Sequence, residues 1–216
     1  SIELAKERGK FPYYEKTFYP EGKLPFRGRE KESGELPLEE KERLKLDWEG
    51  LKEEIKKYGL RNSQTTTNAP TGSISMIAGC SSGIEPNFSL IFEKKITVGT
   101  FYYVNPVFEN VMAREGLFDE ELIKEVSERE GSIQDLTYIP SRLKDIFATA
   151  LDISAEDHIK ALAILQKWTD SSISKTINFP QSATVEDMKN AYLLAHELGC
   201  KDLAVFRNQS MPGVLK

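Results

Sequence analysis

The sequence predicts an α/β fold, and three observations in the last third of the chain support that prediction. Lys175–Phe179 is rich in β-branched residues and ends at a proline, which indicates a buried strand. Thr184 and Asp187 form a Thr-x-x-Asp capping box, which predicts a helix over Val185–Leu198. Asp202–Phe206 has the pattern of a second strand. A strand, a helix and a strand within about 30 residues make a βαβ unit, so the two strands are expected to be parallel.

The preceding part of the chain predicts further helices and two more strands. Residues 1–9 have the pattern of a helix that ends in glycine, and residues 10–37, rich in Pro, Gly and aromatics, predict a long ordered loop. Ser154 begins a helix that runs to Asp170, and its stretch Ala161–Leu165 is apolar on all sides, which predicts deep burial. The remaining expected elements are helices over Leu38–Tyr58, Thr71–Ala78, Asn105–Arg114, Asp119–Glu130 and Ser141–Leu151, and strands over Leu60–Thr67 and Phe88–Ile96.

Composition limits the kind of protein this can be. The 216 residues suffice for one large domain or for part of a larger one, and 39% of them are hydrophobic, without an apolar run long enough to span a membrane. The net charge of -5 argues against general nucleic-acid binding, and no signal peptide is expected at the charged N-terminus. Two cysteines, Cys80 and Cys200, make neither a disulfide framework nor a zinc cluster. We therefore expect no metal site and a reducing, cytoplasmic setting.

The segment Asn68-Ala-Pro-Thr-Gly-Ser-Ile-Ser75 is suited to binding a phosphate. Free N–H groups and the positive end of the helix dipole would point at one place, and Gly72 would let the backbone approach closely. Thr71, Ser73 and Ser75 can add hydroxyl donors. The segment is not a Walker A loop, because it lacks the Gly-Lys-Ser/Thr ending. These residues alone leave two interpretations open: a phosphate-binding loop or an ordinary capped turn.

Five segments become informative when they are taken in their order along the chain. They are Glu3–Gly9 with Phe11-Pro12, Asp47-Trp48 with Gly59–Asn62, Ala-Pro-Thr-Gly-Ser-Ile-Ser at 69–75, Cys-Ser-Ser-Gly-Ile-Glu-Pro at 80–86, and Asp170–Pro180 with Ala183–Asp187. In this order they resemble the C-terminal part of the catalytic subunit of ribonucleotide reductases. The resemblance runs over nearly the whole chain and implies about half of a ten-stranded α/β barrel, with peripheral helices. It implies residues 1–59 as an N-terminal helix, long loop and amphipathic helix, and residues 60–216 as the half-barrel.

Two of the segments are most similar to the class II reductases, which depend on adenosylcobalamin. These are Pro-Thr-Gly-Ser-Ile-Ser and Ser-Lys-Thr-Ile-Asn-Phe-Pro. Class I enzymes relay a radical through two adjacent tyrosines, and the matching positions here are Ala204 and Val205, which cannot form a tyrosyl radical. The resemblance therefore implies adenosylcobalamin as the cofactor of the intact enzyme and no tyrosine relay in this chain.

The resemblance also implies what this chain would do. The residues that would bind the phosphate of a ribonucleoside di- or triphosphate are Pro70, Thr71, Gly72, Ser73, Ile74 and Ser75. The family's radical cysteine lies in an Asn-Pro-Cys-Gly-Glu type motif, and no such motif occurs in the 216 residues. We therefore expect no catalytic residue in this chain, no turnover by the chain alone, and the N-terminal portion of the same enzyme as its partner. The parent enzyme is expected to be a homodimer.

Three interpretations of the chain remain open at this point: a fragment of the enzyme, a free-standing phosphate- or nucleotide-binding module, and a structural half that docks on an N-terminal partner. Other conspicuous residues have ordinary structural interpretations. Cys80 and Cys200 are expected as buried or turn thiols, Trp48 and Trp168 as packing residues, His158 and His196 as structural histidines, and Glu85 mainly as a turn residue.

Overall fold

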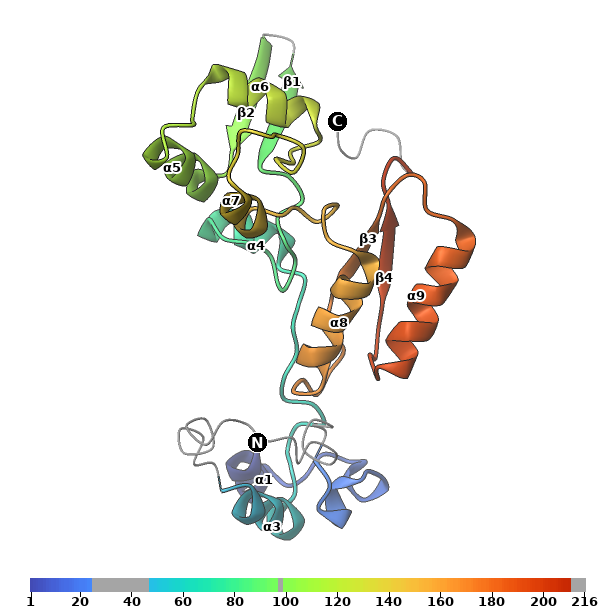
Figure 1. The fold of residues 1–216 in the computed structure, drawn as a ribbon. Helices are drawn as coiled ribbons and strands as arrows, with labels where there is room; N and C mark the ends of the chain where they lie inside the picture. Colours follow the sequence, from blue (N-terminus) through green and yellow to red (C-terminus); the bar gives the residue numbers. More distant parts are fainter. Residues whose placement is uncertain (25–46, 97–98, 211–216) are drawn as a thin grey trace. The chain divides into compact units, whose positions relative to one another are not determined.

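The computed structural model describes residues 1–24, 47–96 and 99–210, and its described part is a mixture of helices and short strands (Figure 1). The chain divides into two compact units, which are treated separately below. One unit comprises residues 1–68, 163–173 and 199–202, and the other comprises residues 69–162, 174–198 and 203–216. Within the described residues, no helix is long and apolar enough to cross a membrane.

The first unit is built from short helices around a small aromatic core. Its helices are α1 (Ile2–Arg8), the 3-10 turns η1 (Tyr14–Lys16) and η2 (Tyr19–Glu21), and α3 (Trp48–Tyr58). Asp47 begins α3 by accepting a hydrogen bond from the Gly50 N–H at 2.8 Å. Tyr14 packs with Tyr19, Ile55 and Leu60, and its hydroxyl donates to the Ile55 carbonyl at 2.7 Å. The helix expected over Leu38–Tyr58 is thus confirmed from Trp48 onward, because its earlier residues lie outside the described part.

The strand expected over Leu60–Thr67 is wrong. Only Asn68 pairs with another strand-like residue, in a single parallel bridge with Ile173. The polar groups of Thr65 and Thr66 form hydrogen bonds with Asp170 in place of a strand ladder. Asp170 accepts a hydrogen bond from the Thr65 N–H at 3.0 Å, and its own N–H donates to the Thr66 hydroxyl at 2.9 Å. The β-branched pattern correctly indicated an extended chain, but its partner is another irregular segment and no ladder forms.

The second unit contains an antiparallel hairpin, β1 (Ile91–Ile96) with β2 (Gly99–Val104), covered by helices. The covering helices are α5 (Pro106–Arg114), α6 (Glu120–Glu128) and α7 (Ser141–Ile146). Phe108, Met112 and Val126 are completely buried in the core that they share. The helices were expected within a few residues of these bounds, whereas β2 was not expected. The short helix α4 (Gly72–Ala78) lies before this hairpin in the chain.

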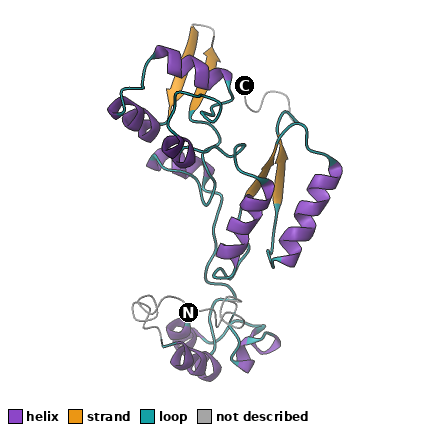
Figure 2. Cartoon of the chain, in the orientation of Figure 1, coloured by secondary structure: helices purple, strands orange, loops and turns teal. Residues whose placement is uncertain are grey.

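The βαβ unit is confirmed. Strand β3 (Thr176–Phe179) pairs in parallel with β4 (Ala204–Arg207), and α9 (Val185–Glu197) connects them (Figure 2). The Thr184–Asp187 capping box is present at the start of α9, with the Thr184 side chain accepting from the Asp187 N–H at 3.2 Å. The two sheets of the described residues have two strands each, so the barrel is not closed by this chain.

Helix α8 (Ala155–Gln166) corrects one expectation about burial. Ser154 caps it as expected, since its hydroxyl accepts a hydrogen bond from the Asp157 N–H at 3.1 Å. Within the apolar stretch Ala161–Leu165, however, only Leu162 and Ala163 are buried, while Ile164 is 60% exposed. Trp168 is likewise 44% exposed, so it is not the packing residue that its spacing predicted. An all-apolar pattern predicts burial only if other elements surround the helix, and the described residues do not cover every side of α8.

Candidate functional site

The predicted phosphate loop lies at the N-terminus of α4, where Thr71 is the N-cap residue. Thr71 has a left-handed backbone with a φ of 49°, which is rare for a β-branched residue. Its Oγ does not cap the helix and instead accepts a hydrogen bond from the Gly83 N–H at 2.9 Å. The first N–H groups of a helix have no partner inside it, so the amides of Gly72 and Ser73 can serve an external anion.

The loop residues divide into an outward and an inward set. Gly72, Ser73 and Ile74 are exposed, and a Cβ placed on Gly72 would meet no other atom within 4 Å. Ser75 is buried, and its hydroxyl donates to the Gly72 carbonyl at 2.9 Å while its N–H donates to the Thr71 carbonyl at 2.9 Å. The structure therefore leaves the amide end of the loop open and uses both donors of Ser75 to hold the turn together.

A cavity of about 660 Å³ lies beside this loop within the second unit. Residues of β3 and β4 that are paired in the parallel ladder line one wall: Thr176 with Ala204, and Asn178 with Phe206. The ring of Phe88 packs edge-on against Phe206, with 6.1 Å between the ring centres. The other lining residues are Gly72, Ser75, Met76, Cys80, Ser81, Ser82, Glu85, Pro86, Asn87, Phe92, Ala150 and Val205. Residues of the loop motif and of the Cys80–Pro86 motif thus line one cavity.

An ion pair between a buried lysine and a partly buried glutamate, whose side chain is 22% exposed, lies at the edge of this cavity, and it was not expected from the sequence. The Lys175 side chain is only 1% exposed, and its ammonium donates to Oε2 of Glu85 at 2.6 Å and to the Thr176 carbonyl at 2.5 Å. The other carboxylate oxygen of Glu85 accepts the Thr176 N–H at 2.5 Å. Glu85 is therefore an anchor to β3 as well as a residue of a turn. The two partners are 90 positions apart, and no local pattern connects them.

His158 has the structural role that was expected. It is 2% exposed, and its Nε2 lies 2.8 Å from the Ala150 carbonyl, so the neutral ring donates its Nε2–H there. Burial lowers the pKa of His158 below its ordinary value, and the positive charge of Lys175 acts in the same direction. Because Ala150 lines the cavity, this hydrogen bond supports one of the cavity walls.

The two cysteines of the chain differ in their exposure. Cys80 is exposed and lines the cavity, in a bend after α4, so it is not buried. Cys200 is half-buried, and burial raises the pKa of its thiol. Both are free thiols. Across the described ranges, His, Cys, Asp and Glu side chains do not gather in groups of three that could hold a metal ion.

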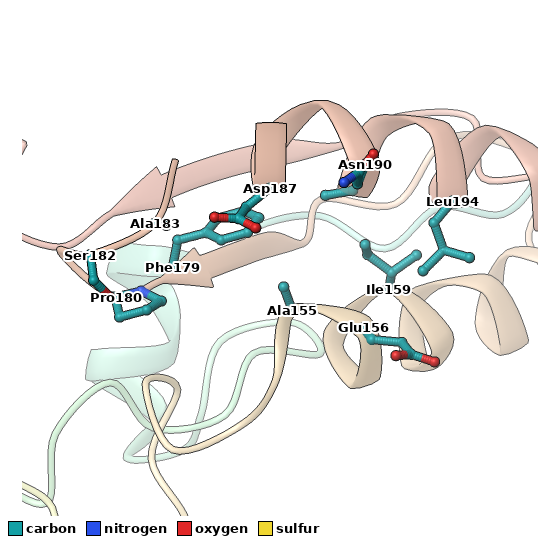
Figure 3. Close-up of a pocket in the computed structure, with 11 residues that line it drawn as sticks. Ala155, Glu156, Ile159, Phe179, Pro180, Ser182, Ala183, Asp187, Asn190 and Leu194 are labelled. Carbon is teal, nitrogen blue, oxygen red and sulfur yellow. The ribbon is translucent and has the colours of Figure 1, made fainter. Parts of the chain in front are cut away.

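A second depression, of about 470 Å³, lies between α8 and α9 (Figure 3). Ile159 of α8 and Leu194 of α9 line it, with Phe179 and Pro180 toward one end. Asp187 also borders it, but the Thr184 N–H and hydroxyl hold that carboxylate, and the N–H bond lowers its pKa. The floor is apolar, and we assign no ligand to this depression.

The fold and the site define a class of protein: an open α/β barrel segment with a hydroxyl-rich loop at the edge of its inner cavity. The model of the ribonucleotide reductase barrel domain matches residues 1–206. The chain belongs to this family. A vitamin B12-dependent ribonucleoside-diphosphate reductase of Thermoplasma acidophilum is 43% identical over 164 residues, which are 76% of this chain and 21% of that protein.

Two further relatives agree with this assignment. A ribonucleoside-diphosphate reductase subunit alpha of Chlamydia pneumoniae is 33% identical over 216 residues, covering 99% of this chain and 21% of that protein. The solved structure of the Actinobacillus ureae class Id ribonucleotide reductase alpha subunit matches with a TM-score of 0.61 and 30% identity, over 73% of this chain and 29% of that one. The chain therefore spans about a fifth of the length of the curated relatives it matches.

Proposed function

We propose that this chain is the C-terminal part of the catalytic barrel of a ribonucleotide reductase. We also propose that its loop 70–75 binds the phosphate of the substrate through residues 71–74, while Ser75 holds the turn. One observation carries the proposal: in a chain of this family, an exposed helix N-terminus with Gly72 and Ser73 opens beside a cavity lined by two parallel strands. The relatives named as ribonucleoside-diphosphate reductases favour a ribonucleoside diphosphate over a triphosphate as the substrate.

The chemistry of this site is recognition and positioning. The amides of Gly72, Ser73 and Ile74 and the positive end of the α4 dipole would hold the phosphate oxygens. The hydroxyl of Thr71 accepts the Gly83 N–H, which leaves its own proton for the phosphate, and Ser73 supplies a second hydroxyl. Holding the phosphate fixes the ribose relative to reactive groups that this chain lacks, and such positioning lowers the entropic part of the barrier.

The remainder of the enzyme would have to complete the site. The radical cysteine motif does not occur in this chain, and we assign its role to the N-terminal portion. The relatives named as vitamin B12-dependent support adenosylcobalamin as the cofactor of the intact enzyme. The cavity wall formed by Ala204, Val205 and Phe206 is apolar and does not by itself make a complete cobalamin site.

Titration calorimetry with inorganic pyrophosphate, CDP and CTP tests the phosphate site. The isolated chain should bind pyrophosphate and CDP, and Gly72→Val should weaken both by at least about tenfold, because its side chain would occupy the place of the ligand. The fold should tolerate this change, since no atom lies within 4 Å of the added Cβ. Ala78→Val, at the exposed C-terminal end of α4, is the matched control and should bind normally. Equal affinity in Gly72→Val would contradict the assignment.

A reconstitution experiment separates the enzyme fragment from an independent binding module. The chain is mixed with the N-terminal portion of the enzyme, adenosylcobalamin, a dithiol reductant and CDP. Formation of dCDP that requires both polypeptides supports our proposal. Binding of CDP by the chain, with no turnover and no association in the mixture, would support the free-standing module instead.

A further inference from the structure

We propose that Glu85 and Lys175 are a positioning pair, which holds the phosphate loop against strand β3. This inference rests on the proposed function for the role of the loop, but its contacts are independent of any ligand. The pair acts through two connected links. One link joins Glu85 to the start of β3, and the other joins the turn that carries Glu85 to Thr71, the residue that begins α4.

In the first link, both oxygens of the Glu85 carboxylate accept hydrogen bonds. Oε2 accepts the Lys175 ammonium at 2.6 Å, and Oε1 accepts the Thr176 N–H at 2.5 Å. Lys175 also donates to the carbonyl of Thr176, so the carboxylate and the ammonium together hold both backbone polar groups of that residue. Thr176 belongs to the cavity wall and to the parallel ladder, where it pairs with Ala204. The carboxylate is therefore attached to a strand whose own position is set by its neighbour.

The second link connects the turn that carries Glu85 to Thr71 of the loop. The Glu85 N–H donates to the Ser82 carbonyl at 3.0 Å, which closes a tight turn around Gly83. From this turn the Gly83 N–H donates to the Thr71 hydroxyl at 2.9 Å. Thr71 has the left-handed backbone conformation, which a β-branched residue keeps only where its surroundings hold it. The turn thus determines where the first free amides of α4 point.

A charged pair fixes the position of two segments through the direction of its hydrogen bonds more than it stabilises the fold. A buried ion pair adds little net stability, because both charges lose their water, but removing one partner leaves an uncompensated charge. The geometry is directional: one carboxylate has to meet an ammonium and a backbone N–H at the same time. An apolar contact of similar volume would hold the segments together without defining their register. The role of the pair is to fix the position of the loop, because a small displacement of a bound substrate lowers the rate of its reaction.

The test uses the double variant Glu85→Ala/Lys175→Met, which removes the link without leaving a buried unpaired charge. Each single change should lower the midpoint of urea unfolding, and the double variant should recover part of that loss. Its affinity for inorganic pyrophosphate should nevertheless fall about tenfold relative to the unmodified chain. The double variant Glu85→Gln/Lys175→Met retains an acceptor for the Thr176 N–H and should regain part of the affinity.

Two controls make the outcome decisive. Thr184→Ala removes the capping box of α9 in the same unit and should lower stability without changing pyrophosphate affinity. Amide hydrogen exchange gives a reading without ligand: in Glu85→Ala/Lys175→Met the Gly83 N–H should exchange at least about tenfold faster. Normal affinity in that variant, or an unchanged Gly83 exchange rate, overturns the positioning role. A failure of the unmodified chain to bind pyrophosphate overturns the phosphate site, and the Gly83 exchange rate still decides the inference.

Discussion

Two helices of the second unit, α6 and α4, have similar apolar residues and opposite surroundings. In α6, Leu122 and Val126 are at most 1% exposed, because β1 and the neighbouring helices cover them. In α4, Met76 and Ile77 are 82% and 87% exposed. The first helix therefore belongs to a core that this chain completes by itself. The second belongs to a surface that the described residues leave open, beside the loop that we assign to phosphate.

The largest effect is expected from a change in the core that α6 shares. Phe108→Ala should lower the free energy of unfolding by about 3–5 kcal/mol, because Phe108 is fully buried and packs edge-on against Phe147 with 5.2 Å between ring centres. Urea unfolding followed by circular dichroism measures the loss. Ile77→Ala is the control on the open surface and should change stability by less than about 0.5 kcal/mol. A comparable loss in both variants would show that α4 is as well packed as the core.

A charge placed on the exposed face of α4 tests whether another polypeptide covers that face. Ile77→Asp should leave the unfolding of the isolated chain unchanged, since the side chain is already in water. If the N-terminal portion of the enzyme covers α4, the dissociation constant between the two portions should rise at least about tenfold, because a carboxylate would be buried in an apolar contact. Surface plasmon resonance with the two portions measures it. Unchanged association would place the contact elsewhere on the chain.

A smaller effect is expected at Thr71, where α4 begins under backbone strain. Both Thr71→Ala and Thr71→Gly remove the acceptor for the Gly83 N–H, but only glycine adopts the left-handed conformation freely. The glycine variant should therefore be more stable than the alanine variant by about 1 kcal/mol in urea unfolding. Equal stability of the two variants would mean that the strain at Thr71 is negligible.

The smallest expected effect is a pH dependence supplied by His158. Its folded pKa lies below the ordinary value of 6.5, because burial disfavours the charged ring. As the pH falls through 6.5, His158 takes up a proton more readily in the unfolded chain than in the folded chain. The contribution of His158 to stability is therefore complete above that pH and decreases below it. Between pH 8 and pH 5, the midpoint of urea unfolding should therefore decline less in His158→Gln than in the unmodified chain. An equal decline in both proteins would contradict the contribution assigned to His158.

Local patterns were sufficient wherever neighbouring residues decide the structure. The side-chain cap at Ser154 and the capping box at Thr184 begin α8 and α9, and the βαβ pattern correctly predicted parallel strands. The family and the position of the loop before α4 also followed from motif order. The strand expected over Leu60–Thr67 and the burial expected over Ala161–Leu165 were wrong, because strand pairing and burial depend on elements far away in the sequence.

By itself, therefore, the sequence determined the helices and their caps, the parallel βαβ unit and the hydroxyl-rich loop, since these depend on contacts between residues close in the chain. The pairing of Lys175 with Glu85 was settled by tertiary packing. Tertiary packing also decided that the two motifs face one cavity. Such pairs are selected by packing between segments as much as 90 residues apart, and nothing in the local pattern of either segment specifies its partner.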